Sequence, residues 1–243
     1  MFESFQMNKF IYLIILFLIF FNSAGLCAVF QNNSKFLGFE SIPPDSLPQY
    51  QILYNGRVWR NLYYKVKEDQ FLFSKEFLPA SITMNGKSFT NVKIKYDIYN
   101  DQILTPMDSG GILQLNKEMV DSFSIFFKNK TYQFTKIPDE NQFGLNGYVN
   151  VIYDGKSTIY VKYIKKITPL AFENKYDEFY QISRIYLIKD NQFFLITKKG
   201  DLFKVLNDKK LQIRDFMKRN SLRVSNAIPE SFIPVIQYYD SIK

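Results

Sequence analysis

Two dipeptides typical of tight turns, Asn85-Gly86 and Asn100-Asp101, enclose a segment in which every second residue is apolar. The apolar positions are Val92, Ile94, Tyr96 and Ile98, and the positions between them are Asn91, Lys93, Lys95 and Asp97. A period of two is the spacing of a strand with one buried face. The stretch 81–105 therefore predicts two consecutive hairpins, and it constrains the chain to an antiparallel sheet.

The turn residues also predict which side chains face each other. Asn-Gly accepts the positive φ angles of a type I′ turn, so Met84 should pair with Lys87 and Ile82 with Phe89. Phe89 is odd-numbered whereas the later apolar residues are even-numbered, so a bulge or break is expected near residues 90–91. The pairs expected across the second turn are Ile98 with Ile103 and Tyr96 with Thr105, and those across a third turn at Asn129-Lys130 are Phe127 with Tyr132 and Ile125 with Phe134.

The rest of the chain predicts a mainly β protein with a single domain over residues 50–243, after an irregular, proline-punctuated lead-in at 29–49. At 243 residues, with 18% aromatic side chains, the chain is long enough for a sizeable core and its composition favours strands. Residues 168–183 are expected to form a short helix or a loop. Further strands are expected at residues 51–54, 58–66, 71–73, 112–115, 184–189, 192–197 and 202–206, with a hairpin apolar on both faces at 148–163. We therefore expect an antiparallel meander sheet, either a sandwich or a partly open barrel.

Two short helices are expected to cover this sheet, from about residue 207 to 243. Asn207 or Asp208 is a typical N-cap for a helix that continues to about residue 220. A second helix is expected at residues 231–242, where Pro234 fits only in the first turn.

Residues 1–28 have the pattern of a secretory signal peptide. Lys9 precedes an uninterrupted apolar run at residues 10–21, and small residues follow it. The run is shorter than the roughly 20 residues that a membrane-spanning helix needs. Cleavage is expected after Gly25 or Ala28. The pattern predicts an exported protein, either periplasmic or associated with the outer membrane.

Cys27 stands near the end of this leader, where a bacterial lipoprotein has its lipid-bearing cysteine. Leu26 disfavours lipidation, because the residue before such a cysteine is normally small. The favoured interpretation is a cysteine that is removed with the leader or left beside the cleavage site. Lipidation of Cys27, with attachment to a membrane, is the alternative.

The chain has no histidine and a single cysteine, which limits the chemistry it can perform. Catalytic groups of the Ser-His-Asp and Cys-His types cannot be built within it, and neither can a zinc site of histidines or several cysteines. An intramolecular disulfide is excluded as well. Carboxylate, lysine, tyrosine and Ser/Lys chemistry remain, and we expect no cofactor and no metal.

Two groups of acidic residues are weak candidates for hydrolytic chemistry. Asp108-Ser109-Gly110 matches the triplet of aspartic peptidases, in which two aspartates share a proton and activate water. Only one such triplet is present, so a polar turn is the favoured interpretation. The acidic residues between 173 and 178 offer paired carboxylates of the kind that glycosidases use, although a solvated acidic face is favoured there.

The net charge of +8 is concentrated in one part of the chain. Residues 162–223 contain 15 Lys and Arg against 7 Asp and Glu, a difference of +8. The densest pairs are Lys165 and Lys166, Lys198 and Lys199, Lys209 and Lys210, and Lys218 and Arg219. Such a patch binds anionic partners such as lipid headgroups or lipopolysaccharide, and export argues against nucleic acid. An ordinary solvated surface is the favoured interpretation of these residues, and anion binding is the alternative.

Several phrases of the chain resemble a known group of proteins. They are the run Lys-Tyr-Asp-Ile-Tyr-Asn-Asp-Gln at residues 95–102, the basic helix expected at 211–220 and the ending at 235–240. The chain resembles exported, β-rich proteins of Bacteroidetes-type Gram-negative bacteria to which no activity is assigned. The resemblance covers most of the chain after the leader and implies export into a Gram-negative envelope. No functional residue transfers with it.

These features predict a non-catalytic protein of the cell envelope that binds a protein partner or an anionic surface component. One alternative is a carboxylate-dependent hydrolase, acting as an aspartic peptidase through Asp108 or as a glycosidase. Another is a carrier of an apolar ligand, if the sheet closes around a cavity lined by aromatic side chains. Aromatic residues at alternating positions are more often simply core.

Overall fold

The computed structural model describes residues 51–138, 145–169 and 176–243. The chain divides into two units, residues 1–47 and 48–243, and the described residues belong to the second. The predictions for the leader, the lead-in segment, Cys27 and Glu173 lie outside the described residues.

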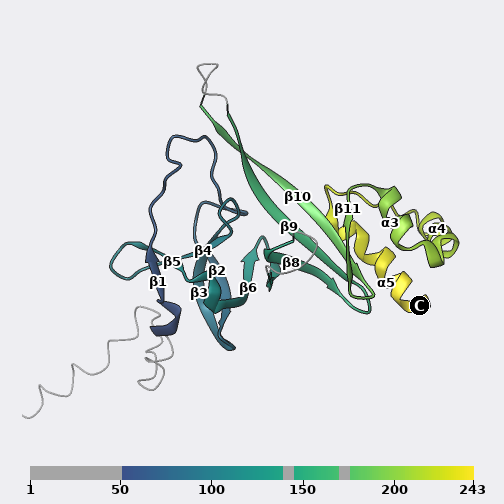
Figure 1. The fold of residues 1–243 in the computed structure, drawn as a ribbon, viewed down its shortest axis with the longest axis horizontal. Coiled ribbons are helices and arrows are strands. Elements are labelled where there is room, and N and C mark those ends of the chain that lie inside the picture. Colours follow the sequence, from purple (N-terminus) through teal and green to yellow (C-terminus); the bar gives the residue numbers. More distant parts are fainter. Residues whose placement is uncertain (1–50, 139–144, 170–175) are drawn as a thin grey trace, which may run out of the picture. The chain divides into compact units, whose positions relative to one another are not determined.

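Eleven antiparallel strands form one open sheet in this part of the chain (Figure 1). They are β1 (Gly56–Val58), β2 (Leu78–Met84), β3 (Lys87–Asp97), β4 (Gln102–Pro106), β5 (Ile112–Leu115), β6 (Val120–Phe127), β7 (Lys130–Ile137), β8 (Gly147–Asp154), β9 (Thr158–Thr168), β10 (Glu178–Lys189) and β11 (Gln192–Ile196). The meanders β2 to β5 and β6 to β11 are joined because β2 pairs with β6, and β1 adds to β5 at one edge. The expected mainly β fold is confirmed, and the sheet does not close, since β1 and β11 are its two ends.

The first hairpin is confirmed in its turn, its register and its bulge. Asn85 and Gly86 have φ angles of 48° and 74°, and Met84 pairs with Lys87. The pairing shifts by one residue between Ala80 and Ile82, opposite Asn91, whose φ is 56°. The turn residues alone are sufficient to predict this hairpin, because Asn-Gly suits both positive φ angles.

The register predicted across Asn100-Asp101 is wrong. Tyr96 pairs with Ile103 and Asp97 with Gln102, so four residues rather than two form the turn. The Asp97 carboxylate accepts hydrogen bonds from the backbone N–H groups of Tyr99 and Asn100, at 3.0 and 2.9 Å. An aspartate that binds its own following backbone builds a longer turn than the dipeptide pattern predicts.

The third hairpin turns at Lys128 and Asn129, with φ angles of 49° and 60°, one residue earlier than expected. Ile125 therefore faces Tyr132, and the predicted pairs are wrong. The prediction that these aromatic and aliphatic side chains share one face still holds. A register shift of two residues along a strand keeps every side chain on its face.

Three expected strands near the start of the described region are wrong. At residues 71–73 only an isolated bridge from Phe71 to Asp97 forms. Residues 51–53 are helical, and only β1 forms a strand between residues 54 and 66. After β1, Trp59 N–H donates to the carbonyl of Ile112, at 2.8 Å, and the chain then leaves the sheet. The Asn61 side chain accepts a hydrogen bond from Tyr63 N–H, at 2.9 Å, which makes a turn where a continuous strand was expected.

Two further predictions fail later in the chain. Residues 178–183, expected as part of a helix or loop, form the start of β10, where Glu178 pairs with Thr168 of β9. Residues 202–206, expected as a strand, lie mostly in the helix α3 (Lys199–Val205). The Asp201 carboxylate accepts from the N–H groups of Thr197 and Lys198, each at 3.2 Å, and so caps the first turn of α3.

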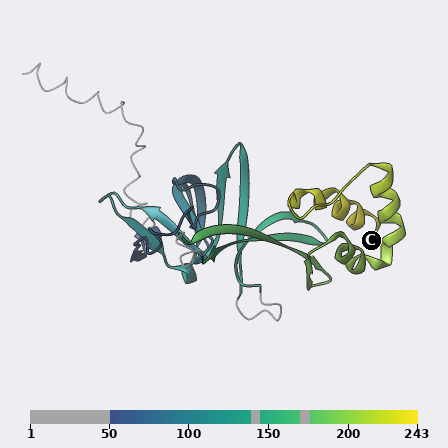
Figure 2. The same ribbon diagram turned by 90° about the horizontal axis from the view of Figure 1, so that it is seen from above.

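The two C-terminal helices are confirmed as α4 (Lys210–Arg219) and α5 (Ile233–Ile242), with Pro234 in the first turn of α5. The expected N-cap is wrong, because Lys209 rather than Asn207 or Asp208 precedes α4. Short 3-10 turns at Asn207–Lys209 and Pro229–Phe232 precede them. In Figures 1 and 2, α3, α4 and α5 lie beside β11 at one end of the sheet. One buried cluster joins the helices to β9, β10 and β11. Its members include Ile159, Leu187, Ile196, Leu202, Phe203, Ile213, Met217, Val235 and Tyr239.

A second core draws on strands from β2 to β8 and contains a group of aromatic rings. Tyr96 makes edge contacts with the rings of Phe123, Phe134 and Tyr148, at centroid distances of 5.1, 5.4 and 6.0 Å. Val149, the residue after Tyr148 on β8, packs in a separate buried cluster. Neighbouring residues of a strand point to opposite faces, so β8 is covered on both sides, as its apolar pattern predicts.

Candidate anion-binding site

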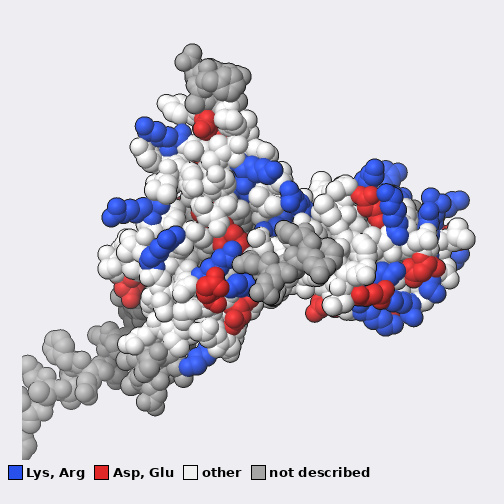
Figure 3. Space-filling model, in the orientation of Figure 1, with Lys and Arg blue, Asp and Glu red and all other residues white. Residues whose placement is uncertain are grey.

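The basic residues singled out from the sequence fall into two places. Lys198, Lys199, Lys209, Lys210, Lys218 and Arg219 lie in or beside α3 and α4, and Figure 3 shows basic side chains gathered over this helical region. Lys165 and Lys166 lie on β9, opposite Gln181 and Tyr180 of β10. The helices pack on Ile159 of β9. Six residues along a strand correspond to about 20 Å, so Lys165 and Lys166 are apart from the helical group.

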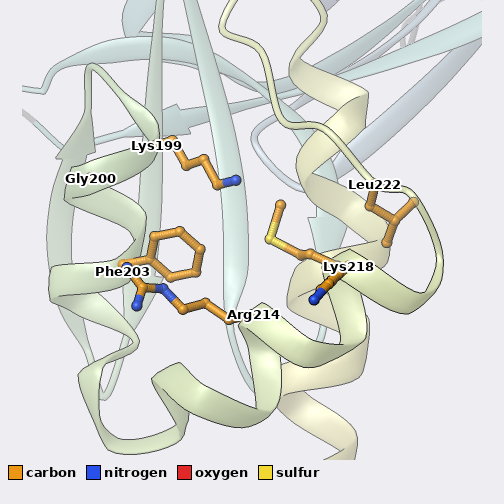
Figure 4. Close-up of a pocket in the computed structure, with 7 residues that line it drawn as sticks. Lys199, Gly200, Phe203, Arg214, Lys218 and Leu222 are labelled. Carbon is orange, nitrogen blue, oxygen red and sulfur yellow. The ribbon is translucent and has the colours of Figure 1, made fainter.

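A hollow of about 420 Å³ opens between α3 and α4. Its lining consists of Lys199, Gly200 and Phe203 of α3, Arg214, Met217 and Lys218 of α4, and Leu222 after α4. Figure 4 shows Lys199, Arg214 and Lys218 around this space, with Phe203 and Leu222 on different sides of it. Three cationic side chains thus surround an apolar floor.

Two of the cations share one aromatic ring. The Lys199 Nζ lies 5.5 Å from the centroid of the Phe203 ring, and the guanidinium carbon of Arg214 lies 5.4 Å from it. The face of an aromatic ring attracts cations, so Phe203 holds two like charges close to each other. Phe203 itself is 8% exposed and Met217 is 3% exposed, and both belong to the core that anchors the helices.

Helical spacing explains how α4 contributes to the hollow. Arg214 and Lys218 are four residues apart, so they lie on the same side of the helix, one turn from each other. Met217 and Ile213 form the buried stripe next to them. The helix is therefore held in place by its apolar stripe while its basic side faces the hollow.

Among the described residues, no ion pair involves Lys199, Arg214 or Lys218. The acidic side chains nearby interact elsewhere: Asp201 caps α3, and Asp208 pairs with Lys189 at 2.8 Å. Burial disfavours the charged form of Asp208, but the hydrogen bonds from Lys189 and Tyr239 prevail and lower the pKa of its carboxyl. Asp215 is an exposed carboxylate on α4 and does not line the hollow. The three cations are therefore available to an external anion.

The sequence predicted only part of this site. Lys199 and Lys218 were singled out by charge density, but Arg214 and Phe203 were missed. Phe203 was missed because its segment was expected to be a strand. Arg214 carries one usable signal, its spacing of four residues from Lys218. The other predicted residues of the group, Lys198, Lys209, Lys210 and Arg219, do not line the hollow.

The acidic candidates occupy other places. Asp108 is exposed in the connection between β4 and β5, where Met107 N–H donates to the Gly111 carbonyl at 2.9 Å. Asp177 and Glu178 stand at the start of β10, and the Asp177 carbonyl accepts from Lys67 N–H at 2.8 Å. Within residues 51–138, 145–169 and 176–243, no three His, Cys, Asp or Glu side chains are grouped to hold a metal ion.

A partly buried ionic network joins the turn between β3 and β4 to Lys117, before β6, and to Lys162 of β9. The Asp101 carboxylate accepts from Lys117 at 2.8 Å, from Lys162 at 3.0 Å and from the Tyr96 hydroxyl at 2.5 Å. Burial disfavours its charged form, but Lys162 and Lys117 outweigh this and lower the pKa of Asp101. Burial, followed by the nearby Asp101 charge, raises the pKa of Tyr96. These charges are paired with each other, so the network joins strands rather than offering a site.

No protein-family model, curated protein or solved structure matches this chain. The resemblance to exported proteins of Gram-negative bacteria stays a prediction. In the described part of the chain, no helix combines the length and hydropathy needed to cross a membrane.

Proposed function

We propose that this protein is a non-catalytic binding protein that holds an anionic component of the cell envelope on the surface formed by α3 and α4. The observation that carries the proposal is the group of Lys199, Arg214 and Lys218, which surround one hollow and pair with no carboxylate of the described residues. Grouped like charges raise the local potential, so the site attracts and retains anions.

Arg214 is the centre of the proposed site. Its planar guanidinium presents several N–H donors in a fixed arrangement that matches the oxygens of a phosphate or carboxylate. Lys199 and Lys218 add mobile point charges from two different helices. An anion between them would reduce the net charge of three mutually repelling cations, and this supports binding at the hollow.

The envelope location is a separate part of the proposal and depends on residues 1–28. Expression in a Gram-negative host, followed by fractionation and intact mass measurement, tests it. A product cut near Gly25 to Ala28 in the periplasm supports export. A diacylated or triacylated Cys27 would instead place the protein on a membrane. An uncut chain in the cytoplasm would contradict the location, but not the anion site.

The anion site is tested by comparing two triple variants with the same change of net charge. The hollow variant carries Lys199→Glu, Arg214→Glu and Lys218→Glu. The control variant carries Lys75→Glu, Lys87→Glu and Lys93→Glu, at exposed residues before β2 and on β3. Each protein is loaded on an immobilised sulfated polysaccharide and eluted with increasing salt. Salt screens all charges, so a global effect would shift both variants equally.

We expect the hollow variant to elute at lower salt than the control variant, which should stay closer to the unmodified protein. Equal elution of the two variants would mean that only net charge matters, and it would contradict the proposed site. Retention by an immobilised acidic protein, with the same dependence on the hollow, would identify a protein as the anionic partner.

A further inference from the structure

The hollow combines cationic side chains with an apolar floor. A purely ionic ligand would interact with the cations alone. We propose that its ligand is an amphiphilic anion: one phosphate or carboxylate group with a hydrocarbon chain attached. The charged group would bind among Lys199, Arg214 and Lys218, and the first carbons of the chain would lie on Phe203, Met217 and Leu222. This inference rests on the proposed function and names the ligand class for the same site.

The floor is apolar because it is an outward extension of the core. Phe203 and Met217 belong to the buried cluster under the helices, and the half-buried Leu222 packs against that cluster. The hollow thus continues core packing to the surface at a place surrounded by cations (Figure 4). An inorganic anion would leave this floor in contact with water, whereas a hydrocarbon chain would cover it.

The size of the hollow sets how much of such a ligand it can take. Its volume of about 420 Å³ lies in the lower part of the range of small-molecule sites. That suits one headgroup with a short length of chain. Since Phe203 and Met217 expose only 8% and 3% of their surface, the contact is shallow, and its benefit should reach a plateau after a few carbons. Each methylene that is fully removed from water strengthens binding by about fourfold.

A series of soluble ligands tests directly whether a hydrocarbon chain contributes to binding. Methyl, butyl and octyl phosphate have the same headgroup, and octanol has the chain without the charge. Calorimetric titration of the full chain with each ligand should give an affinity for butyl phosphate about fourfold or more above that for methyl phosphate, the gain from one fully covered methylene. Octyl phosphate should exceed butyl phosphate only slightly, and octanol should bind more weakly than octyl phosphate. Equal affinities for all three phosphates would overturn the inference.

Leu222 and Leu211 provide a matched pair of variants. Leu222 lines the hollow, whereas Leu211 is 76% exposed on α4 and does not line it. Leu222→Asn should remove the dependence on chain length and leave methyl phosphate binding unchanged, while Leu211→Asn should change neither. If Leu222→Asn melts at a clearly lower temperature than Leu211→Asn, the milder Leu222→Ala is used, with the same expectation. A retained chain-length dependence in the Leu222 variant contradicts the inference.

The outcomes separate this inference from the proposed function. Arg214→Glu could abolish binding of every phosphate while the hydrocarbon chain length has no effect on affinity. That result would support the anion site and contradict an amphiphilic ligand. If no phosphate binds at about 10 mM, both proposals fail.

A vesicle-binding experiment distinguishes a membrane lipid from a free amphiphile as the ligand. The protein is sedimented with phosphatidylcholine vesicles, with and without phosphatidylglycerol. Cosedimentation that requires phosphatidylglycerol and is weakened by Leu222→Asn, but not by Leu211→Asn, supports a membrane lipid. Binding of octyl phosphate without cosedimentation supports a free amphiphile. Equal cosedimentation of the two leucine variants would contradict the proposal that the lipid binds in the hollow.

Discussion

Lysine side chains serve opposite purposes in two regions of this molecule. In the ionic network around Asp101, Lys117 and Lys162 are directed at that one carboxylate, and Lys162 is only 9% exposed. Between α3 and α4, Lys199 and Lys218 surround a hollow without an ion pair among the described residues. A buried charge must be paired because its desolvation is costly, whereas an exposed charge needs no partner. Pairing therefore distinguishes lysines that hold the fold from lysines that are available for binding.

Removing the central carboxylate of the buried network should have the largest effect on stability. Asp101→Asn keeps the shape of the side chain but removes the negative charge that Lys117 and Lys162 both contact. We expect a loss of about 3 to 5 kcal/mol in the free energy of unfolding, measured by urea denaturation. Asp108→Asn, at an exposed turn residue, is the control and should stay within about 0.5 kcal/mol of the unmodified protein. Equal stability of the two variants would show that the network is not structural.

Gly147→Ala should weaken the same network by crowding the Asp101 carboxylate. Gly147 has a φ of 68°, and an added Cβ would stand 1.6 Å from Asp101 Oδ2. Gly86→Ala is a matched control, because its φ is 74° and nothing lies within 4 Å of the added atom. The control should lose about 1 to 2 kcal/mol through backbone strain alone. Gly147→Ala should lose clearly more, and similar losses would mean that Asp101 moves aside freely.

The network should also make stability depend on pH. The folded-state pKa of Asp101 is lowered, so its contribution is complete above the unfolded value of 3.8 and is lost as the pH falls through the folded value. Burial raises the pKa of Asp97, which acts in the opposite direction. The urea midpoint of the unmodified protein should fall more steeply than that of Asp101→Asn as the pH is lowered below about 4. Parallel curves would indicate that other carboxylates dominate.

The smallest expected effect on stability comes from the hollow. Arg214→Gln removes a charge that no described carboxylate pairs, so the free energy of unfolding should change by less than about 0.5 kcal/mol. Its affinity for octyl phosphate should nevertheless fall by about tenfold or more. A large loss of stability would place Arg214 with the structural lysines and remove the contrast between the two regions.

How far the sequence could predict this structure depended on whether the deciding contacts are local. Asn85 and Gly86 determine their own turn, so register and bulge were predictable. At Asn100 and Asp101 the dipeptide pattern was overridden by Asp97, whose side chain binds the backbone of the turn. The helix α3 was missed because its capping signal, Asp201, lies one turn inside the helix, where the apolar pattern also fits a strand.

The site follows the same rule. Charge density predicted Lys199 and Lys218, since it is a property of the sequence alone. The hollow between them exists only because α3 packs beside α4 and brings Phe203 next to Arg214. The sequence separates these two residues and assigned one of them to a strand. Unpaired charge is likewise visible only when the positions of the carboxylates are known.

The most direct test of the account is the nuclear magnetic resonance signal of the Arg214 side chain during titration with octyl phosphate. We expect the Arg214 Nε–H signal to shift strongly and to saturate with the affinity measured by calorimetry. The Nε–H signal of Arg57, which donates to Gln114 at 3.0 Å, should stay in place. If the two signals shift equally, or if only Arg57 responds, the anion binds by general charge or at another site, and the hollow is not the binding site.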